Sequence, residues 1–281
     1  MELEKYDLKV NEAKLNLRIK EIIERSQDLK DKNLFQKIFS LIDLTTLDVA
    51  DTEEKVESMV KKINQLPLRF PDLPNVAAIC VYPAFIPILK RDLKVKSVMK
   101  ASVGASFPSS QTYLDVKINE VERILEEGAD EIDVVISVGK LISGKQDEVF
   151  NELREIKNRM GDKHLKVILE TGVLKNNELI KRASFIAMEA GADFIKTSTG
   201  KNGEGASPEA VYVMCEAIKE FHEKTGKEVG IKPAGGISDV STAIQYYLIV
   251  NEVLGNDWIN PERFRIGASR LANILLGEKY F

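Results

Sequence analysis

Cysteine, histidine and tryptophan are all scarce in this sequence: its 281 residues include two cysteines, two histidines and one tryptophan. Cys80 and Cys215 lie in separate apolar segments, which speaks against a disulfide framework. His164 and His222 lie among charged residues and are poor candidates for zinc ligands. We therefore expect neither a structural metal nor a cofactor.

Long apolar runs and an excess of basic charge are missing as well. No segment approaches the roughly 20 apolar residues that a membrane-spanning helix needs, and residues 1–20 alternate acidic and basic side chains without the apolar core of a signal peptide. The 40 lysines and arginines are outnumbered by 44 aspartates and glutamates, which predicts no basic surface for nucleic acid. These features indicate a cytoplasmic protein with no membrane or nucleic-acid partner.

What the sequence does contain, from Ile38 onward, is a repeated order of short apolar strand, loop and helix. Short β-branched runs of this kind are typical of parallel strands that are buried on both faces. Eight such units predict an α/β fold, a single closed (β/α)8 TIM barrel, with an open doubly wound sheet as the alternative. The eight strands are predicted at 39–43, 77–81, 97–103, 131–136, 165–170, within 190–200, at 228–232 and at 263–266.

A different pattern precedes the repeats, over residues 1–37. This segment is rich in Glu, Lys, Leu and Ile, and Leu15, Ile19 and Ile22 follow one another at helical spacing. We interpret it as a helical N-terminal extension that packs against the catalytic barrel at 38–281 or against a partner subunit. A homodimer or a higher homo-oligomer is expected.

One lysine lies inside a predicted strand. Lys196 follows Phe194 and Ile195 and precedes the hydroxyl-rich segment 197–200. Burial disfavours the ammonium form, so we expect the pKa of Lys196 to be lowered towards the neutral amine that attacks carbonyl groups. The alternative is a lysine whose ammonium group reaches solvent from the end of a strand.

Two more charged residues are expected beside this lysine. Lys232 ends the next predicted strand, and two ammonium groups a few ångströms apart cannot both keep their protons easily. Asp133 lies between Ile132 and Val134 in the fourth strand, where a buried acid needs a charged partner. Inward side chains of a barrel can meet, so Asp133 is the predicted counter-ion. The alternative is a carboxylate that bonds to local backbone or to a helix-facing lysine.

Glycine-rich turns follow the last two predicted strands. Gly235 and Gly236 come shortly after Lys232, and Gly267 and Ser269 lie where the final helix begins. Glycine lets an anion approach backbone N–H groups closely, and the loops after these two strands form the usual phosphate site of such barrels. The sequence therefore predicts phosphate binding by these four residues.

The segments that carry these features resemble those of the deoxyribose-phosphate aldolases. The resemblance follows the order of the chain over residues 38–276. The matching segments are DLTTL at 43–47, AICVYP at 78–83, GADEIDVV at 128–135, FIKTSTG at 194–200, GIKPAGG at 230–236 and FRIGAS at 264–269.

The resemblance implies a class I, Schiff-base aldolase that needs no metal. Its expected reaction is the reversible cleavage of 2-deoxy-D-ribose 5-phosphate to D-glyceraldehyde 3-phosphate and acetaldehyde. Lys196 would be the Schiff-base lysine, Lys232 the lysine that perturbs it, and Asp133 the acid in proton transfer. The residues that the resemblance places around the substrate are Asp43, Thr45, Cys80, Thr199 and Lys201.

Three features depart from the usual pattern of that family. Arg270 stands where many members have a second serine, and it would add charge to the phosphate site if it faces that site. The loop at 107–110 lacks the glycine that commonly follows Phe-Pro. Tyr280 is followed by Phe281, whereas several members use a tyrosine at the very C-terminus in proton transfer.

Two alternative functions stay open on the sequence. One is a Schiff-base aldolase of the same barrel that uses another aldehyde donor. The other is a phosphosugar-binding barrel without turnover.

Overall fold

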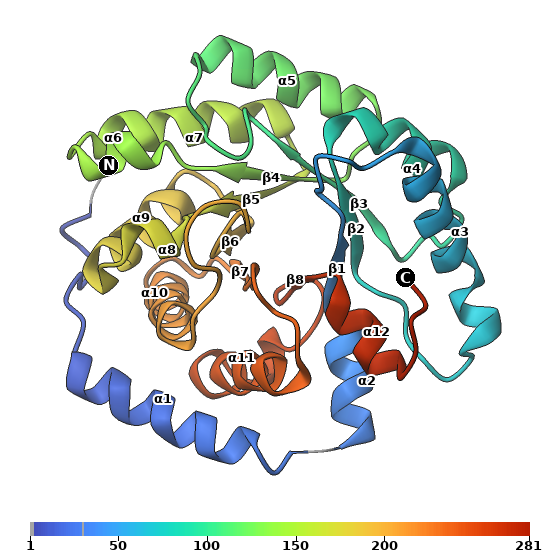
Figure 1. Ribbon diagram of the computed structural model, residues 1–281. Coiled ribbons are helices and arrows are strands. Elements are labelled where there is room, and N and C mark those ends of the chain that lie inside the picture. The colour runs from blue at the N-terminus through green and yellow to red at the C-terminus, as the bar shows by residue number, and fades with distance from the viewer. Residues whose placement is uncertain (1–2, 30) are drawn as a thin grey trace.

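A closed ring of parallel strands forms the centre of the molecule (Figure 1). The computed structural model describes residues 3–29 and 31–281. Consecutive strands pair in the order β7-β6-β5-β4-β3-β2-β1-β8, and two bridges, Ile231 with Phe264 and Ala234 with Gly267, join β7 to β8. The strands are β1 Ile42–Thr45, β2 Ala78–Val81, β3 Met99–Gly104, β4 Glu131–Val135, β5 His164–Ile168, β6 Phe194–Lys196, β7 Gly230–Lys232 and β8 Ile266–Ala268. The predicted (β/α)8 barrel is confirmed.

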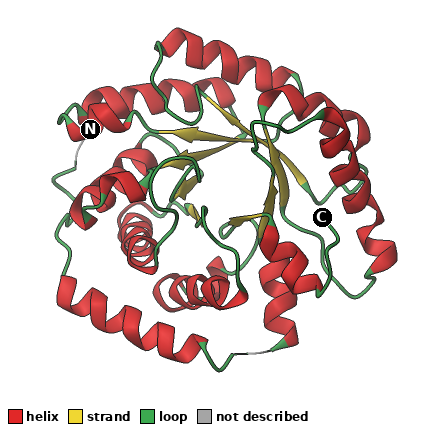
Figure 2. Cartoon of the chain, in the orientation of Figure 1, coloured by secondary structure: helices red, strands yellow, loops and turns green. Residues whose placement is uncertain are grey.

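Helices surround the ring as an outer layer (Figure 2). Their caps follow the sequence signals: Thr52 accepts a hydrogen bond from the backbone N–H of Lys55 at the start of α3, and Ser207 caps α10 ahead of Pro208. The helices that cover the barrel are α3 Glu53–Arg69, α4 Ile86–Asp92, α5 Leu114–Glu126, α7 Gln146–Met160, α9 Asn177–Glu189, α10 Pro208–Thr225, α11 Val240–Leu254 and α12 Arg270–Leu276. Across the described residues, no helix has the length and apolar character needed to cross a membrane.

Two helices precede the first strand. α1 (Glu12–Ser26) packs against α10 and α11, and α2 (Lys32–Ser40) packs against α11 and α12, so both lie outside the helical layer in Figure 1. The ring of Tyr6 stacks on Phe185 of α9 with 4.0 Å between ring centroids. The N-terminal segment thus buries its apolar side on the barrel's own helices.

The structure differs from the sequence-based expectation at several places, and the last strand, expected at 263–266, is β8 at Ile266–Ala268. The first strand was expected from Phe39, but α2 continues to Ser40 because Ile38 and Phe39 are buried as one face of that helix. Two short helices, α6 (Val138–Ile142) and α8 (Thr171–Leu174), follow β4 and β5 and were not predicted. Both lie at the carboxyl ends of strands, where the loops of such barrels carry functional groups.

The two faces of the sheet hold different side chains. The helix-facing side belongs to one large apolar core, whereas the inner side has a small apolar cluster of Ala78, Cys80, Ala101 and Val103 with Leu47. Opposite this cluster the interior is charged. Gly230 leaves room there for Phe194, since a Cβ at position 230 would lie 2.3 Å from the Phe194 ring.

Candidate active site

Three strands, β4, β6 and β7, bring two lysines and a carboxylate together inside the barrel. Lys196 on β6 stands in register with Lys232 on β7. Each lysine donates a hydrogen bond of 2.7 Å to the same oxygen, Oδ2 of Asp133 on β4. The Asp133 and Lys232 side chains are fully buried, and Lys196 is 3% exposed. The structure therefore places the three residues in direct contact.

The two lysines differ in their electrostatic surroundings. Burial lowers the pKa of Lys196; Asp133 opposes this effect, and the nearby Lys232 ammonium adds to it. Burial also acts to lower the pKa of Lys232, but the Asp133 and Asp43 carboxylates outweigh this effect and raise that pKa. The same cations hold the pKa of Asp133 well below its usual range despite burial. Lys196 is therefore the amine that gives up its proton more readily.

The second carboxylate oxygen of Asp133 is less engaged. Oδ1 is buried and has no hydrogen-bond partner among residues 3–29 and 31–281. The ammonium group of Lys166 lies 3.5 Å from it. This oxygen therefore faces the Lys166 ammonium and keeps an unused capacity to accept a hydrogen bond.

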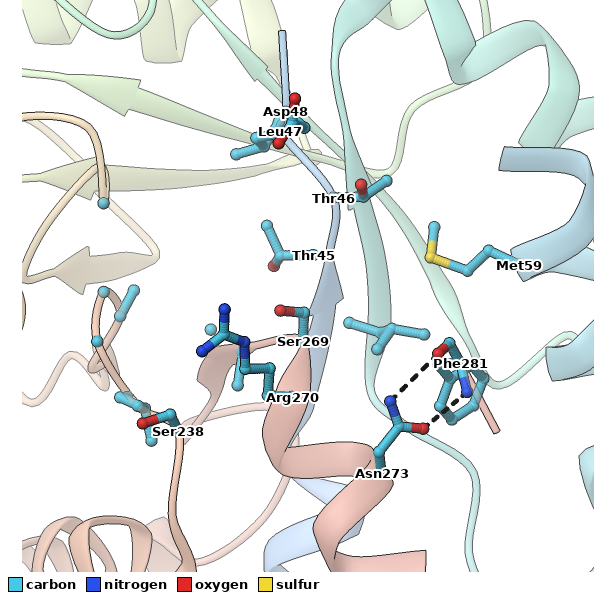
Figure 3. A pocket seen from close by; sticks show the side chains of 18 of the residues that line it. Thr45, Thr46, Leu47, Asp48, Met59, Ser238, Ser269, Arg270, Asn273 and Phe281 are labelled. Carbon is cyan, nitrogen blue, oxygen red and sulfur yellow. Dashed lines mark hydrogen bonds between the residues drawn. The ribbon is translucent and has the colours of Figure 1, made fainter. Parts of the chain in front are cut away.

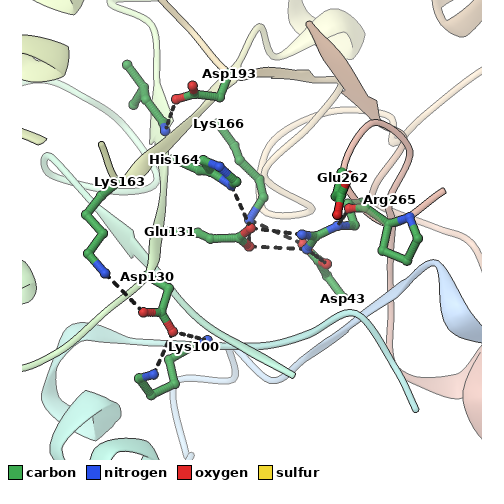
Figure 4. A network of polar contacts seen from close by, with 12 residues as sticks. Asp43, Lys100, Asp130, Glu131, Lys163, His164, Lys166, Asp193, Glu262 and Arg265 are labelled. Atoms are coloured by element: carbon green, nitrogen blue, oxygen red, sulfur yellow. Dashed lines mark hydrogen bonds and ion pairs between the residues drawn. The ribbon is translucent and has the colours of Figure 1, made fainter. Parts of the chain in front are cut away.

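A further layer of ions lies beside Asp43 (Figure 4). Arg265 donates to Asp43 Oδ1 at 2.7 Å and to both oxygens of Glu131, at 2.9 and 3.2 Å. Lys166 on β5 pairs with Glu131, and Lys232 Nζ lies 2.5 Å from Asp43 Oδ2. Asp43 thus joins this ion layer to the lysine pair.

A cavity of about 740 Å³ opens above the buried lysines (Figure 3). Lys196 is part of its lining, so the amine is reachable from the cavity although almost fully buried. Eight of the residues singled out in the sequence line it: Lys196, Thr45, Thr199, Lys201, Gly235, Gly236, Gly267 and Ser269.

Asp43 and Cys80, which the resemblance places around the substrate, lie in the inner wall of the barrel, and their contact with substrate stays a prediction. Both side chains are fully buried, and neither is part of the cavity lining. Asp43 is held by Lys232 and Arg265 and is therefore a counter-ion of both. Burial and the nearby Asp133 raise the pKa of the Cys80 thiol to about 11, so it is a neutral group in the inner wall.

The glycine turns line one side of the cavity. Gly235 and Gly236 have φ values of +86° and +77°, a conformation that favours glycine. A Cβ at Gly267 would lie 2.8 Å from Ala234 Cβ, so a side chain there would crowd the neighbouring strand end. Arg270 also lines the cavity, next to Ser269 (Figure 3). The arginine that replaces a serine of the family pattern therefore faces the site.

Two loops are tied together across the mouth of the cavity. Lys201 donates to the backbone carbonyl of Leu47, which links the loop after β6 to the loop after β1. Glu170 accepts hydrogen bonds from the backbone N–H and the hydroxyl of Thr199, at 3.0 and 2.6 Å. Glu170 has a φ of +59°, so the end of β5 turns sharply to make this contact.

The C-terminal residues approach the same cavity. Phe281 is part of the lining, whereas Tyr280 turns away and its hydroxyl donates to the Lys62 carbonyl at 2.9 Å. Asn273 holds the tail by accepting hydrogen bonds of 2.7 Å from the N–H groups of both residues. The tyrosine is therefore engaged on the outer side of the site in this structure.

Three charged residues of the interior were missed by sequence reasoning. Glu131, Lys166 and Arg265 are at most 3% exposed and belong to the ion layer. A signal for one of them was present: Glu131 stands two positions before Asp133, and alternation along a strand places both on the same face. The same rule places Arg265 on the face of Gly267, ahead of β8.

Fold and site together define an enzyme of the (β/α)8 class with a buried lysine that lines its cavity. A model of the "DeoC/LacD family aldolase" matches residues 37–256, which is more than half of the chain. The chain belongs to the DeoC/LacD family of aldolases.

Named relatives agree with this assignment. The human deoxyribose-phosphate aldolase is 40% identical over 246 residues, which cover 84% of this chain and 77% of that protein. The bovine deoxyribose-phosphate aldolase is also 40% identical over the same shares. Among solved structures, the tetrameric deoxyribose phosphate aldolase from Aeropyrum pernix has a TM-score of 0.68 at 25% identity and covers 91% of this chain and 96% of that one.

Proposed function

We propose that this protein is a deoxyribose-phosphate aldolase, which cleaves 2-deoxy-D-ribose 5-phosphate reversibly to D-glyceraldehyde 3-phosphate and acetaldehyde. The observation that carries the proposal is a buried amine, Lys196, whose pKa is lowered and which lines a cavity with glycine turns. Relatives named for this activity, at 40% identity over most of the chain, support the choice of substrate.

The first half of the reaction needs an unprotonated amine. Neutral Lys196 attacks the C1 aldehyde of the sugar, and the resulting carbinolamine loses water to form a protonated imine. Lys232 keeps its proton beside Asp133 and thereby disfavours a second ammonium ion at Lys196. The cationic imine is the electron sink for the next step.

The second half breaks a carbon–carbon bond. A base removes the proton of the C3 hydroxyl, the C2–C3 bond breaks, and its electron pair moves to C2 to give an enamine and D-glyceraldehyde 3-phosphate. Asp133 Oδ1 is the proposed acceptor, through a bound water, because Oδ2 is already engaged with both lysines. Protonation of C2 and addition of water to the imine release acetaldehyde and regenerate the amine.

The phosphate group is proposed to bind between the two glycine turns. Gly235 and Gly236 provide backbone that an anion can approach closely, and Ser269 follows the end of β8 in the neighbouring turn. Arg270 lines the same side and supplies a positive charge that suits a phosphate dianion. Thr45, Thr199 and Lys201 are proposed to contact the sugar.

The test is chemical trapping of the imine. Incubation with acetaldehyde and cyanoborohydride is expected to attach one ethyl group to Lys196, located by peptide mass spectrometry, and EDTA is expected to leave turnover unchanged. Lys201→Leu serves as the matched control, because it removes a cavity lysine and leaves Lys196 in place. Loss of turnover in EDTA together with absence of an adduct would overturn the Schiff-base proposal.

Substrate choice is tested separately. Acetaldehyde, propanal, acetone and dihydroxyacetone phosphate are compared as donors with D-glyceraldehyde 3-phosphate as acceptor. A clear preference for acetaldehyde supports the proposal, and a preference for another donor identifies a different aldolase. Trapping without turnover of any of them would identify a binding barrel.

We also infer that the protein forms a homo-oligomer. The solved relative from Aeropyrum pernix is described as tetrameric, which supports the inference. Light scattering on the full chain and on a chain that begins after residue 30 measures the oligomer and the part that the first helix plays in it. A monomer at micromolar concentration contradicts the inference.

A further inference from the structure

The charged groups inside the barrel are balanced when Lys196 is left out of the count. Three carboxylates, those of Asp43, Glu131 and Asp133, face three cations, those of Lys166, Lys232 and Arg265. All six side chains are at most 3% exposed. The connected cluster is therefore electrically neutral only while Lys196 carries no proton.

We propose that Arg265 and Glu131 are positioning residues that set the protonation state of Lys196 by keeping the buried ion cluster neutral. They act from a layer that does not line the cavity. The inference rests on the proposed function, because it concerns the amine that forms the imine.

A continuous chain of contacts links this layer to the reactive amine. Arg265 holds Asp43 Oδ1 at 2.7 Å, and Asp43 Oδ2 lies 2.5 Å from Lys232. Lys232 and Lys196 share Asp133 Oδ2, each at 2.7 Å. Removing the charge of Arg265 therefore changes the electrostatic potential at Lys196, because the groups between them are buried and not screened by water.

The surroundings of each of the six residues favour its charged form. Counter-ions outweigh burial and lower the pKa values of Asp43, Glu131 and Asp133. Counter-ions likewise outweigh burial and raise the pKa values of Lys166, Lys232 and Arg265. Lys196 is the one lysine of the cluster for which burial prevails. This contrast agrees with a neutral cluster that has no place for a seventh charge.

The groups that influence Lys196 come from several strands. Asp133 on β4 and Lys232 on β7 contact its near side, and the Cys80 thiol on β2 lies close enough to act on it. At the other end of the cluster, His164 Nδ1 lies 3.2 Å from Glu131 Oε1, and its side chain is 37% exposed. A His164→Asn background removes this imidazole from the comparison.

The experiment measures the pH dependence of imine formation in charge variants of the ion layer. The initial rate of trapping by acetaldehyde and cyanoborohydride is followed across the neutral and alkaline range. Arg265→Gln removes a positive charge, which favours the Lys196 ammonium, so its midpoint is expected to rise. At an effective dielectric of about 20, one charge on the order of 10 Å away shifts the midpoint by about one pH unit.

Two matched variants separate charge from packing. Arg265→Lys keeps the charge and loses the bidentate contact, so it is expected to keep the wild-type midpoint even if turnover falls. The double variant Glu131→Gln with Arg265→Gln removes one charge of each sign and is expected to restore the midpoint. A purely structural role would lower the rate in all three variants at an unchanged midpoint.

The midpoint of the trapping rate distinguishes a role in charge balance from a purely structural role. A midpoint in Arg265→Gln that stays within about 0.3 pH units of the wild type overturns the inference. If that single variant does not fold, Glu131→Gln alone decides: it removes a negative charge, so its midpoint is expected to fall, and an unchanged midpoint contradicts the charge-balance argument. Failure of the wild-type protein to form any adduct would instead refute the proposed function.

Discussion

The replacement Lys232→Leu tests whether the Lys232 ammonium lowers the pKa of Lys196. Lys196 Nζ and Lys232 Nζ both lie 2.7 Å from Asp133 Oδ2, so the two nitrogens are at most twice that distance, about 5.4 Å, apart. Leucine removes the positive charge and leaves a shorter, apolar side chain. Arg265 still contacts Asp43 at 2.7 Å, so that carboxylate keeps one counter-ion.

The size of the effect follows from Coulomb's law. At an effective dielectric of about 20, two unit charges about 5.4 Å apart repel by about 3 kcal/mol, which corresponds to about two pH units. Lys232 lowers the pKa of Lys196, so its removal raises that pKa by about this amount. Below the wild-type midpoint, the fraction of neutral amine is then about 100-fold smaller than in the wild type at the same pH.

The assay is the trapping rate as a function of pH, with Lys232→Arg as the matched control. The wild-type rate rises as Lys196 loses its proton, and in Lys232→Leu this rising limb is expected to move to higher pH. Lys232→Arg keeps the charge and is expected to leave the limb where it was. Removing one partner from a buried ion pair also costs about 3–5 kcal/mol of stability, so folding is checked by circular dichroism. A folded Lys232→Leu variant with an unmoved limb would refute the coupling of the two lysines.

Three further predictions concern single roles in the site. Lys196→Leu is expected to abolish both trapping and turnover while the far-ultraviolet circular dichroism stays unchanged, and residual trapping at the wild-type rate would exclude this lysine. Asp133→Asn is expected to retain trapping, because the carboxylate raises the pKa of Lys196 and its loss does not disfavour the neutral amine. Retro-aldol turnover is expected to fall about 100-fold or more. Equal losses in both assays would contradict a role of Asp133 as base. Arg270→Ala is expected to raise KM for the phosphorylated sugar about tenfold and to leave trapping with acetaldehyde unchanged, and an unchanged KM would remove Arg270 from the phosphate site.

The barrel and the lysine pair could be predicted because their signals are local. Eight strand-helix units are visible in the pattern of apolar runs, caps and turns, and the structure confirms the barrel. Consecutive strands of such a barrel are neighbours, so the sequence alone places Lys196 and Lys232 side by side, as they are in the structure. Asp133 could be added because a carboxylate between apolar residues of a strand needs a charged partner.

The ion layer could not be predicted because it depends on long-range pairing. Arg265 meets Glu131, which is 134 positions away, and Asp43, which is 222 positions away. Nothing local distinguishes a buried Lys166 from a lysine that reaches solvent. For the same reason Asp43 was expected beside the substrate: its position at a strand end was visible, but its two cationic partners were not.

Each of the three strands of the site carries a second inward residue, two positions before the one near the reactive amine. These pairs are Glu131 and Asp133, Phe194 and Lys196, and Gly230 and Lys232. The absence of a side chain at Gly230 gives the Phe194 ring its place in the interior, where the Lys166 ammonium and the Arg265 guanidinium lie 5.8 and 5.4 Å from its centroid. An aromatic ring beside the ions keeps water from them and strengthens every charge interaction in the cluster. The low polarity that lowers the pKa of Lys196 thus depends on residues that never meet the substrate. Buried ion clusters are weak contributors to stability, so we attribute the presence of this one to the protonation state that it imposes.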